Sequence, residues 1–211
     1  MASFLRNLGL SFADVGFVKL NVFFGPMVLL AHGIVTTWCK SEMSLAAVNQ
    51  MPVPAEKVPF FVLILMPIIA ILCAIIALEA LSALASTGYQ SQKGREQKDA
   101  GNLAKAGLPG WISRTQAAQY NTFECCILML CTFFVAKELA VPKLLFAKIA
   151  TLLLLLRVTY PVLYATDLDM FRTQVWLTGT YACVLLGFAA LFPDTVLPML
   201  GEVVVVPKKG W

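Results

Sequence analysis

The sequence predicts an all-α integral membrane protein: a four-helix transmembrane bundle with an extra N-terminal apolar helical segment. Two observations lead to this prediction. The first is composition, since 59% of the 211 residues are apolar and only 13% are charged. Soluble domains carry about a quarter charged residues, so a water-soluble fold is excluded. The second is the presence of four long apolar runs.

Each apolar run is long enough to cross a bilayer, which takes about 20 residues. The runs are Phe60–Ala85, Ala118–Ala140, Leu144–Ala165 and Phe171–Phe192. None alternates polar and apolar residues as a barrel strand does. We expect helices, because a backbone in lipid must satisfy its own hydrogen bonds. The short connection Thr166–Met170 predicts that the last two helices are antiparallel neighbours.

A fifth apolar segment, Leu20–Cys39, precedes these runs and contains Pro26. The proline predicts a break, and the segment either lies at the membrane interface or spans as an irregular helix. The expected organisation is an N-terminal extension over residues 1–59, a membrane domain over 60–192 and a C-terminal tail over 193–211.

Charge and cysteine content exclude several classes of function. The net charge of +4 is small and dispersed, so no nucleic-acid partner is expected. The six cysteines form no CxxC pair, and His32 is the only histidine, so we expect core thiols and no metal site. A channel or transporter is disfavoured, because the sequence has no internal repeat and no continuous polar path.

Three ionisable residues interrupt the runs at a common depth. In an antiparallel bundle, Glu79, Glu124 and Arg157 all lie about 9–12 Å below the same membrane edge. Charges at membrane depth are costly, so such residues mark either a functional site or a structural pairing. Both interpretations stay open here: an ion pair between Glu124 and Arg157 that joins helices, or a pocket for a small anionic ligand.

Helical spacing places these residues on two polar stripes. The first stripe is Arg114, Ala117, Asn121 and Glu124, and the second is Arg157, Tyr160 and Tyr164. Residues separated by three, four or seven positions share one face of a helix. Facing stripes predict a pocket with cationic, amide, carboxylate and phenol groups, with Arg172 and Thr173 at its mouth. Trp176 suits an aromatic belt at the membrane interface.

Three linked motifs resemble the MAPEG superfamily, the membrane-associated proteins in eicosanoid and glutathione metabolism, and are most similar to its bacterial-type branch. The first lies in residues 114–124, from Arg114 through Asn121 to Glu124. The second comprises Arg157, Tyr160, Pro161, Tyr164 and Asp167. The third runs from Arg172 through Trp176 to Gly179. The motifs occur in the expected order within about Phe60–Phe192.

The resemblance implies a homotrimer with glutathione bound between neighbouring subunits. By motif position it assigns glutathione binding or pocket shaping to Arg114, Asn121, Glu124, Arg157, Tyr160 and Tyr164. Arg172, with Thr173 beside it, stands where the family stabilises the glutathione thiolate. The implied activity is that of a glutathione-dependent transferase or peroxidase acting on lipophilic electrophiles.

Two positions depart from the family pattern. Ala117 and Tyr120 are uncharged where the glutathione-using members usually carry basic residues. A charge-assisted hydrogen bond contributes about 1.5–3 kcal/mol, so the loss of two cations weakens a glutathione site. The alternative expectation is a non-catalytic accessory subunit of a larger organellar membrane complex, respiratory or photosynthetic.

Overall fold

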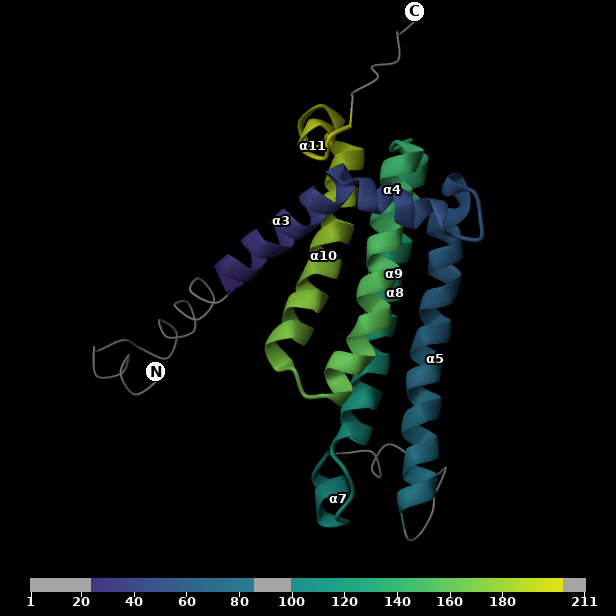
Figure 1. Ribbon diagram of the computed structural model, residues 1–211, viewed down its shortest axis with the longest axis vertical. Coiled ribbons are helices and arrows are strands. Elements are labelled where there is room, and N and C mark those ends of the chain that lie inside the picture. The colour runs from purple at the N-terminus through teal and green to yellow at the C-terminus, as the bar shows by residue number, and fades with distance from the viewer. Residues whose placement is uncertain (1–23, 86–99, 203–211) are drawn as a thin grey trace, which may run out of the picture.

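The structure, a computed structural model, describes residues 24–85 and 100–202, and these ranges consist of helices and the turns between them (Figure 1). The long helices are α5 (Val58–Leu84), α8 (Trp111–Glu138), α9 (Lys143–Ala165) and α10 (Asp169–Leu191). The shorter ones are α3 (Gly25–Lys40), α4 (Glu42–Asn49), η2 (Ala55–Lys57), α7 (Ala100–Lys105) and α11 (Pro193–Met199).

Among the residues that the structure describes, four helices are long and apolar enough to cross a membrane, which confirms the predicted four-helix fold class. They are Ala55–Leu84, in which η2 leads into α5, and the full lengths of α8, α9 and α10. The second helix begins at Trp111, seven residues before the predicted apolar run. Its first two turns carry Ser113, Arg114, Thr115 and Gln116, so they are too polar to be recognised by hydropathy.

The four spans run side by side as a bundle, and short turns join α8 to α9 and α9 to α10 (Figure 1). Only residues 166–168 separate α9 from α10, so these two helices are antiparallel neighbours, as the sequence predicted. Asp167 in this turn has φ 63°, and Ala140 in the α8–α9 turn has φ 53°. Both are left-handed conformations that let the chain reverse within a few residues.

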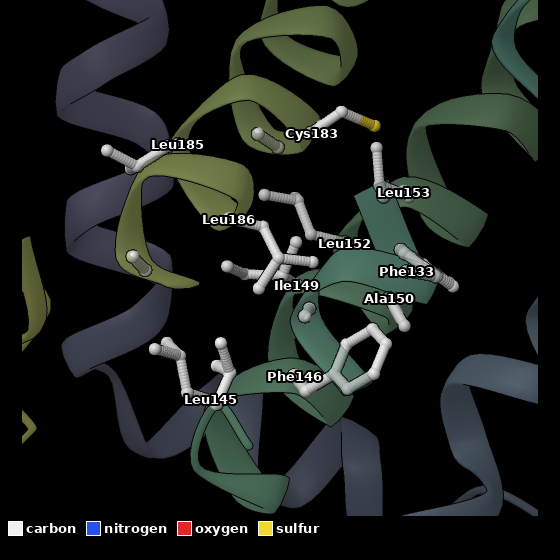
Figure 2. Close-up of a cluster of buried hydrophobic side chains, with 14 of the residues drawn as sticks. Phe133, Leu145, Phe146, Ile149, Ala150, Leu152, Leu153, Cys183, Leu185 and Leu186 are labelled. Atoms are coloured by element: carbon white, nitrogen blue, oxygen red, sulfur yellow. The ribbon is translucent and has the colours of Figure 1, made fainter. Parts of the chain in front are cut away.

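The core of the bundle lies where α8, α9 and α10 meet (Figure 2). Ile149 and Leu153 of α9 and Leu186 of α10 are completely buried. The rings of Phe133 and Phe146 pack edge to face at 4.8 Å between centroids. By contrast, most side chains of the α5 span face outward, as expected for an outer helix in contact with lipid or with another chain.

The predicted segment Leu20–Cys39 corresponds mainly to α3, and residues 20–23 lie outside the described ranges. Pro26 occupies the first turn of α3, where a proline without an N–H costs nothing. The 16 residues extend about 24 Å, less than a bilayer requires. In Figure 1, α3 lies obliquely across α10, and α4 crosses the end of the bundle.

Candidate functional site

A pocket of about 220 Å³ opens between α8, α9 and α10, near the edge at which α9 ends and α10 begins. Its lining consists of Asn121, Glu124, Tyr160, Tyr164, Arg172, Thr173 and Trp176. Six of the eight residues predicted for the site therefore line one pocket. Arg114 and Arg157 do not line it, and Trp176 is an addition.

Asn121 joins α8 to α9 at the centre of the pocket. Its side-chain Nδ2 donates to the Tyr160 hydroxyl at 3.2 Å and also to the Tyr164 hydroxyl. The two phenol rings meet edge to face, with centroids 4.9 Å apart. Each hydroxyl accepts from the amide through a lone pair, so this contact does not engage the proton of either hydroxyl.

Arg172 projects from the first turn of α10 and lies over the ring of Tyr164. Its guanidinium carbon is 4.4 Å from the ring centroid, and Nη2 forms an ion pair with Asp169 Oδ1 at 2.7 Å. A guanidinium carries five N–H donors, so this single carboxylate contact leaves most of them for a ligand. Arg172 supplies a cation to the pocket lining.

Thr173 lines the same pocket, one residue further along α10. Its hydroxyl donates to the Asp169 carbonyl at 2.8 Å. A threonine hydroxyl has one proton, and here that proton is engaged by the helix. In this geometry Thr173 can accept a hydrogen bond from a ligand, whereas Arg172 can donate one.

Arg157 lies behind the pocket, within the bundle, with 1% of its surface exposed. Its guanidinium carbon is 4.8 Å from the Tyr160 ring centroid. A Cβ added at Gly179 would lie 3.5 Å from Nη2, so the group sits where α9 faces α10. None of its three guanidinium nitrogens has a hydrogen-bond partner among the described residues.

The structure does not form the ion pair considered between Glu124 and Arg157. Within the described ranges, the carboxylate-to-arginine pairs are those of Arg114 and Arg172. Glu124 and Glu79 are exposed on the surface of the single chain, whereas Arg157 points inward. The common depth expected from the sequence did not bring these three residues together, because Arg157 is buried whereas the two glutamates are exposed.

Arg114 contacts the end of α9 and lies outside the pocket lining. Nε donates to the Tyr164 carbonyl at 3.1 Å, and Nη2 donates to the Ala165 carbonyl at 3.4 Å. Asp167 Oδ1 lies 3.6 Å from Nε. A cation at a helix C-terminus satisfies carbonyls that the helix leaves unpaired. Arg114 therefore holds the helix end that carries Tyr164.

Trp176 was predicted to be an interfacial aromatic residue, but it forms one wall of the pocket. The signal that could have found it is its spacing. Trp176 lies four residues after Arg172 and three after Thr173, so all three share one face of α10.

The MAPEG family model matches residues 59–192, which is more than half of the chain. The chain belongs to the MAPEG family. This MAPEG protein carries its pocket wholly within the matched range, whereas α3 and α4 precede that range and α11 follows it. No curated protein and no solved structure matches the chain.

Proposed function

We propose that this MAPEG protein is a glutathione-dependent membrane transferase or peroxidase that acts on lipophilic electrophiles. The observation that supports the proposal is the pocket itself, in which six residues predicted from three separate motifs meet. Glutathione would supply the thiol that attacks or reduces the electrophile. The protein would bind and orient it at the membrane edge.

The lining matches the groups that glutathione presents. Arg172 can hold a carboxylate, and Glu124 can accept from the ammonium group. The Asn121 side chain and the hydroxyls of Tyr160 and Tyr164 offer hydrogen bonds to the peptide part. Because charges in a low-dielectric site act over longer distances, the buried Arg157 adds positive potential behind the pocket and favours an anionic ligand.

A neighbouring copy would complete the site. Small-molecule pockets usually enclose about 300–1,000 Å³, and this pocket of about 220 Å³ is smaller and open. Glu124 is exposed at membrane depth on the single chain, where an uncovered carboxylate is costly. A homotrimer, the assembly that the family resemblance implies, would cover both the open side of the pocket and the Glu124 carboxylate.

Calorimetry with glutathione tests the proposal on the protein in mild detergent, with its oligomer intact. We expect binding that Arg172→Gln weakens about 10-fold to 150-fold, since a charge-assisted hydrogen bond contributes about 1.5–3 kcal/mol. Lys105→Gln is the control, because it removes an exposed cation of α7 outside the pocket.

Two results would contradict the proposal. Equal affinities of the wild type and Arg172→Gln would remove Arg172 from the site. No binding at millimolar glutathione would reject the enzyme and favour the accessory subunit suggested by Ala117 and Tyr120. With binding established, turnover of an aryl halide or a lipid hydroperoxide would distinguish the transferase from the peroxidase.

A further inference from the structure

A second, larger pocket lies at the opposite end of the bundle from the candidate glutathione site. It encloses about 420 Å³ where α5 and α9 begin and α8 ends. Its charged lining residues are Lys137, Lys143 and Glu56, and its apolar lining includes Phe60 and Phe146. None of these residues belongs to the three motifs that define the first site.

The cations of this pocket are available to a ligand. Lys137 Nζ lies over the ring of Phe60, 5.6 Å from its centroid. Neither Lys137 nor Lys143 makes an ion pair within the described part of the chain, although Glu56 lines the same pocket. The two lysines outnumber the one glutamate, so the lining carries a positive balance that an anion would complement.

The backbone adds to this positive potential. α9 starts at the pocket without a side-chain cap and without an acidic residue in its first turn. α5 continues from η2, whose Glu56 lines the same pocket, so the partial positive charge beside the lysines comes from the N-terminus of α9. The C-terminus of α8 carries partial negative charge, which lowers the positive potential of the pocket. Lys137 in the last turn of α8 offsets that negative charge.

The floor of the pocket is apolar and continues onto the membrane-facing surface. Phe146 is buried and held edge to face against Phe133, as Figure 2 shows. Phe60, Ile64 and Ile68 follow at intervals of four residues down α5, and all three are exposed. This stripe leads from the pocket along a transmembrane helix, where acyl chains lie.

We propose that this pocket binds the anionic headgroup of a bilayer phospholipid, with an acyl chain along Phe60, Ile64 and Ile68. The position of the pocket at the end of three spans places the lysines at headgroup depth and the stripe at chain depth. A soluble anion would leave the apolar stripe unused, and a zwitterionic lipid would gain little from the lysines.

Native mass spectrometry tests the assignment on the full chain released from nanodiscs that contain equal amounts of phosphatidylglycerol and phosphatidylcholine. We expect the wild type to retain phosphatidylglycerol at least tenfold more often than phosphatidylcholine. The double variant Lys137→Gln/Lys143→Gln should lose this preference. The control Lys40→Gln/Lys105→Gln removes the same charge outside the pocket and should keep it.

The hydrophobic half of the proposal has its own variant. Ile64→Asn places an amide on the stripe and should reduce phosphatidylglycerol retention while leaving glutathione affinity unchanged. Inorganic phosphate at millimolar concentration should not displace the lipid, because it offers no acyl chain.

Three outcomes would overturn the proposal. The wild type could retain the two lipids equally, both double variants could lose the phosphatidylglycerol preference equally, or phosphate alone could displace the bound phosphatidylglycerol. The wild-type preference is informative even if a variant fails to fold. It should also decrease as the salt concentration rises, since exposed charges are screened.

Discussion

Arg157 has an environment that is unusual for a charged side chain. It is nearly fully buried, and its guanidinium nitrogens have no hydrogen-bond partner among the described residues. Contact with the Tyr160 ring compensates for part of the lost hydration, since a desolvated cation–π contact contributes about 2 kcal/mol. An unsatisfied buried charge in a native protein is usually retained for function. Arg157 therefore favours ligand binding at the site but lowers the stability of the fold.

Arg157→Met should therefore stabilise the protein while weakening glutathione binding. Methionine keeps much of the side-chain volume, and removing the unpaired guanidinium recovers about 1–3 kcal/mol of desolvation cost. The thermal unfolding midpoint in mild detergent should rise, whereas calorimetry should show lower affinity. Arg157→Lys is the control, because it keeps a buried charge and should not stabilise. A lower midpoint for Arg157→Met would mean that the guanidinium has partners in the assembly.

The N-terminal helix α3 is joined to the bundle by polar contacts as well as by apolar packing. Trp38 Nε1 donates to the Lys148 carbonyl at 2.7 Å, and Lys148 Nζ donates to the Cys39 carbonyl at 2.7 Å. His32 Nδ1 and the Tyr181 hydroxyl form a further hydrogen bond at 2.8 Å. Burial raises the pKa of Cys39 to about 12, and the charge of Lys148 partly opposes this rise. Cys39 therefore reports whether α3 is docked.

Lys148→Met should loosen α3. It removes a charged hydrogen bond that contributes about 1.5–3 kcal/mol, while the Lys148 carbonyl contact to Trp38 remains. Alkylation of Cys39, followed by peptide mass mapping, should become faster, because loss of burial lowers its pKa. If α3 stayed docked, removing the lysine charge would raise the pKa and slow the reaction, which would contradict the prediction. Lys57→Met, an exposed lysine at the start of α5, is the control.

The amino-acid sequence predicts much of this molecule, because hydropathy and helical period report on single helices. Hydropathy predicts the four spans, and the helical period predicts the two polar stripes. Side-chain direction across helices does not, which is why Glu124 and Arg157 were considered partners although one faces outward and the other inward. Trp176 was assigned to the membrane interface on residue type alone. The exact start of α8 was missed because its first turns are polar.

The surface of the single chain favours an assembly of identical copies. Glu79 and Glu124 are exposed on helices that are long and apolar enough to span a membrane, where an uncovered charge is costly. A neighbouring copy that covered Glu124 would also close the open pocket beside it. In a cyclic assembly each copy receives the same cover from its neighbour.

We therefore expect native mass spectrometry of the protein from mild detergent to give a homotrimer. Glutathione titration should saturate at one equivalent per chain, because each copy contributes one pocket lined by Asn121, Arg172 and Trp176. Glu124→Ala should reduce glutathione affinity, since it removes the carboxylate that accepts from the ammonium group. Single chains with full glutathione affinity would show that one copy suffices. If the protein instead occurred in a fixed ratio with other proteins and did not bind glutathione, it would be an accessory subunit. The residues of the pocket would then serve only to hold α8, α9 and α10 together.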